Sequence, residues 1–385
     1  MGLTPTSPHL RVLHCIGGLG GGGAERQLSY LSAGLIRKGI DVHVAYLRPG
    51  PNLTRAQDSG ATLHELRSHG NYDPFLPWRL IKLVRKVRPD LIQTWLPQMD
   101  ILAGLAAVLT KTPLLMTERS SVQAYNGNWK GGLRSWLGRR AALIVANSNS
   151  GREYWMSKTQ PDLIKVIRNG VPVEEIQRTP PICWEARDVL ETTEVLLFAG
   201  RYSPEKNTST LLDAIFLVLA ERANAIALLF GEGPQKSELM ERVKRQGMED
   251  RVRILGYTTQ LWSWMKRAKV FVSVSLFEGS PNTVLEAAAQ RCPLVLSDIA
   301  EHRELFVDEM VFFVPPRTPG EIAHAILEVF RDPEGAKRRA ESAYERVSRL
   351  TVDSVIGEYL SAYRLALAKS GFPEGAKEER LGETT

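Results

Sequence analysis

Short runs of apolar residues alternate along this chain with longer stretches whose apolar residues recur every three or four positions. The run RVLHCI at 11–16 predicts a buried strand, and the stretch 24–39 predicts a helix with one leucine-rich face that ends at Gly39. Further strand-like runs follow as VHVAYL, LIQTW, LLMT and LIVAN, with helical patterns between them. This strand–helix order predicts a parallel sheet covered by helices on both faces.

The alternation starts again after a proline-containing connector, QRTPPICW. The apolar runs of this second series lie at 195–200, 226–231, 252–256, 270–275, 293–297 and 311–314. A chain of 385 residues is too long for one core, so the fold class we predict is α/β with two doubly wound, parallel-sheet domains. Ligands of such sheets bind outside the carboxyl ends of the strands, so we expect the two domains to face each other across a cleft. The predicted parts are a first domain at 1–176 completed by a helix at 352–370, a linker at 177–194, a second domain at 195–351 and a flexible tail at 371–385.

A glycine-rich loop, HCIGGLGGGGAERQL, joins the first strand to the first helix. The dinucleotide fingerprint G-x-G-x-x-G fits Gly18, Gly20 and Gly23. An NAD site also requires an acidic residue at the end of the second strand, but this chain has Arg48 and Pro49 there. The residues therefore disfavour a nicotinamide enzyme and leave two alternatives open, an ordinary tight turn or a loop that approaches another phosphate ligand.

Charge and composition limit the classes of ligand and surface that this chain is expected to bind. The net charge is +6 and the isoelectric point about 9.2, which favours anionic ligands or surfaces. Three widely spaced cysteines predict neither a disulfide framework nor a metal site and fit a reducing, cytoplasmic location. No apolar run is long enough to span a bilayer, and no nucleic-acid-binding motif is present.

Two loops of the second domain carry candidate chemistry. Arg201 and Lys206 flank a loop that follows a strand, where two cations can hold a diphosphate. In FEGSPNTVLEA, at 277–287, we expect Ser280 to cap a helix whose first turn holds Pro281. Such a helix N-terminus suits phosphate, and carboxylates near it, those of Glu278 and Glu286, can accept hydrogen bonds from sugar hydroxyls. Solvated surface charges are the alternative for each of these side chains.

These motifs together resemble the group 1, glycogen-synthase-like family 4 of retaining glycosyltransferases with the GT-B fold. The matching residues are Gly200-Arg201 with Lys206, the turn Gly231-Glu232-Gly233-Pro234, the pair Glu278 and Glu286, and GGAE at 22–25. The resemblance implies transfer of a sugar from a nucleotide-diphosphate sugar to a glycan or lipid-linked acceptor. It places this activity in cell-surface polysaccharide, lipopolysaccharide or glycolipid assembly, with no cofactor.

The resemblance also implies a role for each site residue. Arg201, Lys206 and Glu278 would be catalytic, with the two cations neutralising the diphosphate and Glu278 beside the donor sugar. Glu286 would hold the ribose hydroxyls. The remaining donor contacts would come from Gly22, Gly23, Glu118, Arg119, Gly200, Gly231, Tyr257, Gly279, Ser280, Pro281, Asn282 and Thr283. Glu118 and Arg119 stand where the family often has histidine, and Arg291 stands where it usually has glycine, which puts the donor's identity in doubt.

The sequence has no D-x-D motif, so we expect the cations to replace a metal ion in stabilising the leaving diphosphate. The segment 128–144 interleaves tryptophan and leucine with lysine and arginine, and we expect it to contact an anionic membrane surface, with the enzyme peripheral at the inner face of the membrane. A packed helix with solvated charges is its alternative. A non-catalytic GT-B subunit, a sugar-nucleotide epimerase and a glycoside hydrolase remain as rival functions.

Overall fold

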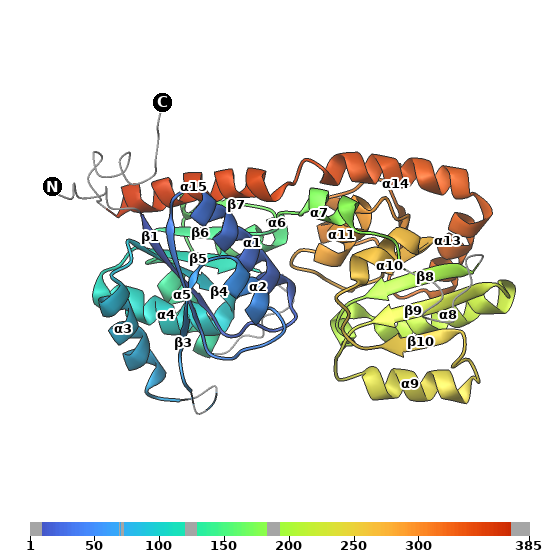
Figure 1. Ribbon diagram of the computed structural model, residues 1–385, viewed down its shortest axis with the longest axis horizontal. Helices are drawn as coiled ribbons and strands as arrows, with labels where there is room; N and C mark the ends of the chain where they lie inside the picture. Colours follow the sequence, from blue (N-terminus) through green and yellow to red (C-terminus); the bar gives the residue numbers. More distant parts are fainter. Residues whose placement is uncertain (1–9, 69, 71–72, 120–128, 183–192, 371–385) are drawn as a thin grey trace. The chain divides into compact units, whose positions relative to one another are not determined.

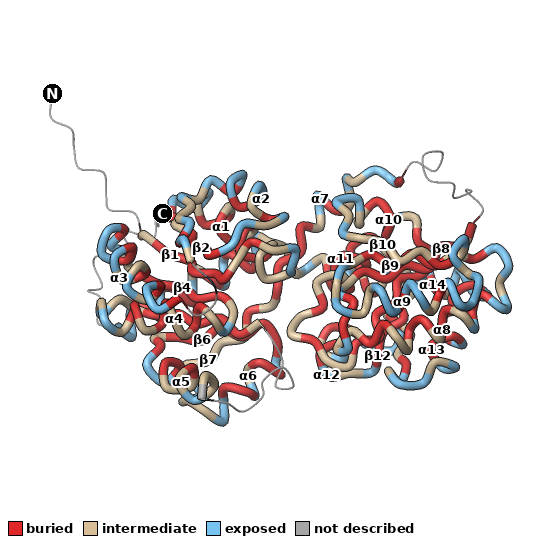
Figure 2. Tube along the Cα trace, turned by 90° about the horizontal axis from the view of Figure 1, so that it is seen from below, coloured by how far each residue is buried: buried red, intermediate tan, exposed pale blue. Residues whose placement is uncertain are grey.

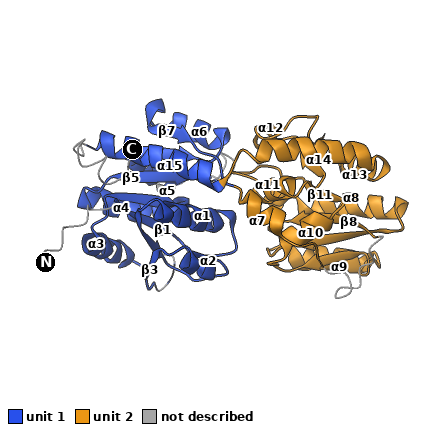
Figure 3. Cartoon of the chain, turned by 45° about the horizontal axis from the view of Figure 1, so that its top comes forward, with its two compact units in different colours: residues 1–170, 352–385 blue, residues 171–351 orange. Residues whose placement is uncertain are grey.

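The computed structural model describes residues 10–68, 70, 73–119, 129–182 and 193–370. The chain divides into two compact units, unit 1 with residues 1–170 and 352–385 and unit 2 with residues 171–351 (Figures 1 and 3). Helix α7 (Val173–Arg178) spans the predicted boundary between the first domain and the linker at 176, and it belongs to unit 2, where Ile176 is buried in the core.

Unit 1 is built on a seven-stranded sheet in the order β3-β2-β1-β4-β5-β6-β7, and all neighbouring strands are parallel. Its strands are β1 (Arg11–Ile16), β2 (Asp41–Tyr46), β3 (Thr62–Glu65), β4 (Leu91–Trp95), β5 (Leu114–Glu118), β6 (Leu143–Ala146) and β7 (Ile164–Val166). Its helices are α1 (Gly23–Arg37), α2 (Leu53–Asp58), α3 (Leu76–Val87), α4 (Leu96–Thr110), α5 (Trp129–Gly138), α6 (Asn149–Met156), the short η2 (Pro161–Leu163) and α15 (Val352–Lys369).

Unit 2 has a six-stranded sheet in the order β10-β9-β8-β11-β12-β13, again parallel throughout. Its strands are β8 (Glu194–Ala199), β9 (Ala225–Phe230), β10 (Val252–Leu255), β11 (Val270–Ser273), β12 (Leu294–Ser297) and β13 (Phe312–Val314). Besides α7, its helices are η3 (Pro204–Lys206), α8 (Thr208–Glu221), α9 (Lys236–Arg245), α10 (Leu261–Arg267), α11 (Asn282–Ala289), α12 (Ala300–Arg303), α13 (Pro319–Arg331) and α14 (Pro333–Val347).

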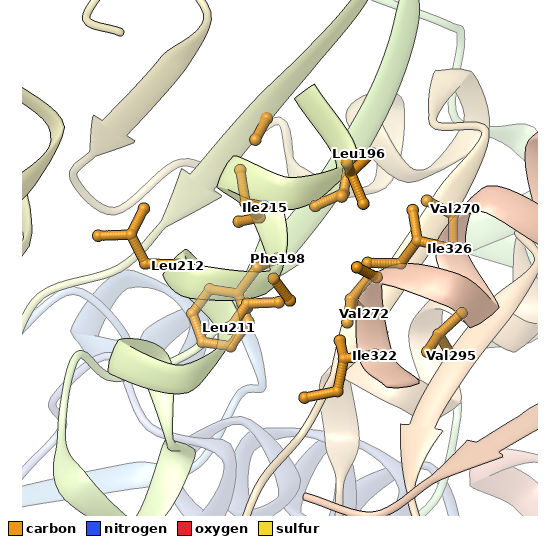
Figure 4. Packing of buried hydrophobic residues seen from close by; sticks show 14 of the residues in the cluster. Leu196, Phe198, Leu211, Leu212, Ile215, Val270, Val272, Val295, Ile322 and Ile326 are labelled. Carbon is orange, nitrogen blue, oxygen red and sulfur yellow. The ribbon is translucent and has the colours of Figure 1, made fainter. Parts of the chain in front are cut away.

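Each unit has cores on both faces of its sheet, as expected for strands that are apolar on both sides. In unit 2, side chains from β8, α8, β11, β12 and α13 point toward one another (Figure 4). The central strands are buried, while the outer faces of the helices are exposed (Figure 2). None of the helices in the described ranges is both long and apolar enough to cross a bilayer.

The C-terminal helix α15 packs on α1 at a glycine. A Cβ atom on Gly34 would lie 1.8 Å from Cδ1 of Ile356, so any larger residue here would require the Ile356 side chain to move. The helix α1 begins at Gly23 and ends at Arg37, and Gly39 follows in the left-handed region with φ of 80°. The predicted C-terminal stop at Gly39 is therefore confirmed.

Because all strands in a sheet run in the same direction, each sheet has one edge where every strand ends, here called its carboxyl edge. The strand order reverses between β1 and β4 in unit 1 and between β8 and β11 in unit 2. Ligands of doubly wound sheets bind at such reversal points, so these two positions define where a site is expected in each unit.

Candidate functional site

The reversal point of unit 2 brings together two charged residues that are far apart in the sequence. The loop after β8 carries Lys206 and the loop after its neighbour β11 carries Glu278. The Nζ atom of Lys206 lies 2.5 Å from Oε1 of Glu278 in an ion pair. The loop after β8 is held in place by Asn207, whose side-chain amide donates to the carbonyl of Val274 at 3.1 Å.

Glu278 is almost fully buried, with 7% of its surface exposed. Burial alone would raise the pKa of Glu278, but the charge and hydrogen bond of Lys206 outweigh it, with help from the Ser275 hydroxyl 2.7 Å away. The resulting pKa lies below the ordinary value for a glutamate, so the carboxylate is ionised at neutral pH.

A chain of buried polar groups supports Glu278 from the sheet side. The Ser297 hydroxyl donates to the carbonyl of Ser275 at 2.7 Å, and Nδ1 of His302 donates to the carbonyl of Ser297 at 2.8 Å. Burial lowers the pKa of His302, so the ring is neutral at pH 7, and its Nε2 has no hydrogen-bond partner among the described residues. Sequence reasoning missed Ser275, Ser297 and His302. The two serines stand at the ends of apolar runs, whereas His302 lies on α12.

Two glycines of the G-x-G-P turn allow the loops after β8 and β9 to touch. A Cβ atom on Gly231 would lie 1.9 Å from the carbonyl oxygen of Gly200, and one on Gly233 would lie 2.3 Å from that of Tyr202. Either clash would push the backbone around Arg201 away from its position. Arg201 itself is exposed and forms no ion pair within the described ranges, so its guanidinium is available at the carboxyl edge.

Glu286 lies on α11, and the residue is 5% exposed. Nε1 of Trp262, on α10, donates to its Oε2 at 3.0 Å, which orients the carboxylate; sequence reasoning did not single out Trp262. The predicted cap was wrong by one residue. The helix begins at Asn282, and Pro281, with φ of −82° and ψ of 72°, stands at the cap position, so Ser280 lies outside the helix and does not cap it.

The other predicted residues of unit 2 lie on the same edge. Tyr257 follows β10 and is 53% exposed. Gly279, Ser280, Asn282 and Thr283 are half-buried in the loop and first turn of α11. Unit 2 therefore gathers the G-R…K loop, the G-x-G-P turn and both glutamates at its carboxyl edge.

In unit 1, the glycine loop after β1 is held against the segment after β2. The amide of Leu19 donates to the carbonyl of Arg48 at 2.9 Å, and the Asn52 side chain donates to the carbonyl of Gly20. No glycine from 17 to 23 has a positive φ, so none is required by a left-handed turn, whereas a Cβ atom on Gly18 would lie 3.3 Å from the carbonyl oxygen of Arg48. Gly22 and Gly23 form the N-terminus of α1.

The two residues after the predicted strand LLMT, Glu118 and Arg119, differ in burial and in their hydrogen-bond partners. Glu118 is fully buried, and its Oε2 accepts hydrogen bonds from Arg134 at 2.9 Å and from Nε1 of Trp155 at 3.0 Å. Arg119 is half-buried and donates to Asn169 and to the hydroxyl of Tyr359, both at 2.6 Å. The Glu118 side chain is thus engaged inside unit 1, whereas Arg119 lines a small pocket together with Gln27, Tyr30 and Arg168.

The segment expected at a membrane contains α5, and part of it is internal. Arg134 is 3% exposed and Leu137 fully buried, and Nε of Arg134 lies 2.7 Å from Oδ2 of Asp100. Arg139 and Arg140 are exposed just after the helix. Residues 120–128 lie outside the described ranges. Arg134 and Leu137 therefore take part in core packing, whereas Arg139 and Arg140 remain on the surface.

Two parallel α/β units, one completed by the C-terminal helix, define the GT-B class of glycosyltransferase folds. HepE from Anabaena, solved in complex with UDP-glucose, matches this fold with a TM-score of 0.80 at 21% identity, over 92% of this chain and 100% of that one. The chain belongs to the group 1, family 4 glycosyltransferases. Residues 193–332 match the family described as "Glycosyl transferases group 1" and residues 21–175 match "Glycosyltransferase Family 4".

The similar curated proteins are distant in sequence. The chain is 25% identical to the putative glycosyltransferase EpsF of Bacillus subtilis over 94% of this chain and 98% of that protein. It is 27% identical over 246 residues to the N-acetylgalactosamine-N,N'-diacetylbacillosaminyl-diphospho-undecaprenol 4-alpha-N-acetylgalactosaminyltransferase of Campylobacter jejuni, covering 61% of this chain and 65% of that enzyme. The match therefore spans less than two-thirds of the Campylobacter enzyme.

Proposed function

We propose that this protein is a retaining glycosyltransferase that moves a sugar from a nucleoside-diphosphate sugar to a glycan or lipid-linked acceptor. The observation that carries the proposal is the Lys206–Glu278 ion pair at the reversal point of unit 2, with Arg201 exposed on the same loop after β8. Family membership and the UDP-glucose complex of HepE support the assignment of the ligand class.

The cations act on the leaving group. As the bond between the anomeric carbon of the donor sugar and the diphosphate oxygen breaks, negative charge grows on the diphosphate, and Arg201 and Lys206 stabilise that charge. Lys206 is fixed by Glu278 before the donor binds, so little reorganisation is needed at the moment of reaction. The backbone amides at the start of α11, from Asn282 to Thr283, add donors for phosphate or sugar oxygens.

The two glutamates act on hydroxyl groups. Glu286, oriented by Trp262, accepts hydrogen bonds from the ribose hydroxyls, and Glu278 accepts them from the donor sugar. In unit 1, Gly22, Gly23 and Arg119 contact a ligand at that unit's own carboxyl edge. Glu118 is left out of this proposal because its carboxylate is bound by Arg134 and Trp155.

The acceptor we propose is lipid-linked and presented at the inner face of the cytoplasmic membrane. The Campylobacter relative carries an undecaprenol-linked acceptor in its name, and EpsF matches nearly the whole chain. A binding-only subunit would bind the same nucleotide and release no product.

Transfer should continue without a divalent metal ion. We expect the rate of nucleoside diphosphate release, measured with a nucleotide-sugar panel and a bacterial lipid extract as acceptor, to change less than about twofold in EDTA, because Arg201 and Lys206 supply the positive charge. The anomeric configuration of the product, read by NMR, should match that of the donor. Complete loss of activity in EDTA that Mg²⁺ or Mn²⁺ restores would contradict the proposed mechanism.

A further inference from the structure

Helix α3 of unit 1 exposes two aromatic side chains at its N-terminal end. Phe75 and Trp78 are 63% and 62% exposed. The start of the helix is fixed from inside, because Oδ1 of the buried Asp73 accepts a hydrogen bond from the amide of Phe75 at 2.9 Å and Oδ2 pairs with Arg79 at 2.9 Å. The two rings therefore project from an ordered helix end rather than from a loose loop.

The exposed face of α3 is also cationic. Lys82, Arg85 and Lys86 are exposed, and residues 76–87 contain no acidic side chain. The spacing 75, 78, 82, 85 and 86 places the aromatic and basic residues on one face of the helix. Nζ of Lys82 lies 5.5 Å from the ring centroid of Trp78, in keeping with that spacing. Figure 2 shows exposed positions along this helix.

The opposite face anchors the helix in the unit. Leu76, Leu80 and Leu83 are buried in the core beneath it. Since α3 follows β3, its aromatic end lies toward the carboxyl edge of the unit 1 sheet, the edge at which ligands of such sheets bind. The basic residues continue along the helix from there.

We infer that the α3 face, defined as Phe75, Trp78, Lys82, Arg85 and Lys86, binds the anionic surface of a phospholipid bilayer. Exposed aromatic rings at one end and an unbroken set of cations beside them are the chemistry of an interfacial helix, whose rings enter the headgroup layer while the cations meet lipid phosphates. Because the face carries basic side chains and no acidic ones, we expect it to bind an anionic bilayer rather than a neutral one. It takes the role that the sequence suggested for 128–144, where Arg134 is internal.

The inference deepens the proposed function, because a lipid-linked acceptor resides in such a surface, but its test does not use the reaction. Flotation with vesicles of phosphatidylglycerol and phosphatidylethanolamine measures binding of the full chain, and vesicles of phosphatidylcholine supply the neutral comparison. We expect binding to the anionic vesicles that weakens as salt rises. Phe75→Ser with Trp78→Ser, and Lys82→Glu with Lys86→Glu, should each weaken it at least about tenfold.

Matched controls separate this face from general hydrophobicity and charge. Leu217→Ser with Met240→Ser removes two exposed apolar side chains of unit 2, which are 47% and 51% exposed. Lys337→Glu with Arg338→Glu makes the same change in net charge on α14. Both control pairs should bind vesicles like the wild type, and all four pairs should keep the thermal unfolding midpoint and nucleotide affinity.

Three results would overturn the inference. The first is that the wild type does not bind anionic vesicles, and the second is that it binds phosphatidylcholine vesicles equally well. The third is that Lys337→Glu with Arg338→Glu weakens vesicle binding as much as Lys82→Glu with Lys86→Glu does. A dimer that Phe75→Ser with Trp78→Ser dissociates, without vesicle binding, would assign the face to a second copy instead. Vesicle binding in a protein that binds no nucleotide sugar would refute the proposed function and leave the α3 face standing.

Discussion

Replacing Arg201 with alanine lowers kcat by about 10²–10³ and leaves the fold intact. In the proposed mechanism the guanidinium is one cation beside the leaving diphosphate, and losing one such stabilising group typically costs about 3–4 kcal/mol of transition-state stabilisation. Because Arg201 is exposed and pairs with no described residue, its removal leaves no buried charge behind. Steady-state kinetics at saturating donor, with thermal unfolding as the check on folding, measures the effect.

Lys206→Ala has a similar effect on kcat and a second one on its partner. Without the ammonium group 2.5 Å away, burial dominates and the pKa of Glu278 rises. A carboxyl whose folded-state pKa rises loses its contribution to stability as pH increases, so this variant should be less stable at pH 8 than at pH 5 relative to wild type. Arg201→Ala should show no such pH dependence.

Lys244→Ala is the matched control, since Lys244 is an exposed cation of unit 2 on α9. It should keep wild-type kcat. If Arg201→Ala and Lys206→Ala both retain kcat within about threefold of wild type, the assignment of the catalytic cations is refuted.

Arg134→Met destabilises unit 1 by about 3–5 kcal/mol, the usual cost of removing one partner from a buried ion pair. Arg134 bridges two carboxylates that are completely buried, with Nε 2.7 Å from Asp100 and Nη2 2.9 Å from Glu118. Without it, both acids face the interior with no cation between them. Urea unfolding followed by tryptophan fluorescence detects the change, because the Arg134 guanidinium lies 4.8 Å from the ring centroid of Trp155.

The stability lost in Arg134→Met should depend on pH, and the pKa of the buried Asp100 determines in which direction. Burial already raises the pKa of Asp100 above its usual value, and Arg134 lowers it in part, so removing Arg134 raises it further. A raised folded-state pKa favours the folded state at low pH and costs stability as pH rises, so the defect should be larger at pH 8 than at pH 5.

Two companion variants make this prediction specific. Arg139→Met removes an exposed arginine that follows the same helix and should cost less than about 0.5 kcal/mol. Adding Asp100→Asn and Glu118→Gln to Arg134→Met removes the buried charges and should recover much of the loss. A small effect of Arg134→Met at every pH would show that the cluster does not hold α5 in place.

The sequence predicts the α/β class and the phosphate-side motifs because both depend on local patterns. Strand runs that are apolar on both faces indicate parallel sheets, and the carboxyl ends of such strands place the motifs on one edge. Gly231 and Gly233 were visible in the sequence as a G-x-G-P turn, but only the structure shows that their missing side chains let two loops touch. The edge strands β3 and β7 escaped prediction because they are short and half-exposed, so they lack the apolar signal of the central strands.

Side-chain partners are what the sequence could not reveal. Nothing in the order of residues shows that Trp262 bonds to Glu286, or that Glu118 turns inward to Arg134, because both contacts depend on how separate elements pack in three dimensions. Arg291, in contrast, was already visible in the sequence as an unusual residue. Its departure from the family's usual glycine was visible, and the structure shows why glycine is usual there, since its φ is 56°. The guanidinium stacks 3.5 Å from the ring centroid of Tyr344 and pairs with Glu341 at 2.8 Å, contacts that offset the strain.

The measurement that bears most directly on the donor site is calorimetric binding of UDP, GDP, ADP and CMP, without added metal, to the wild type and to Glu286→Ala. We predict that one nucleotide binds the wild type with clear preference and that Glu286→Ala weakens it at least about tenfold, because a carboxylate that accepts hydrogen bonds from ribose hydroxyls contributes about 1.5–3 kcal/mol. Binding of no nucleotide, or equal affinity in wild type and Glu286→Ala, would contradict a nucleotide-sugar site at the carboxyl edge of unit 2.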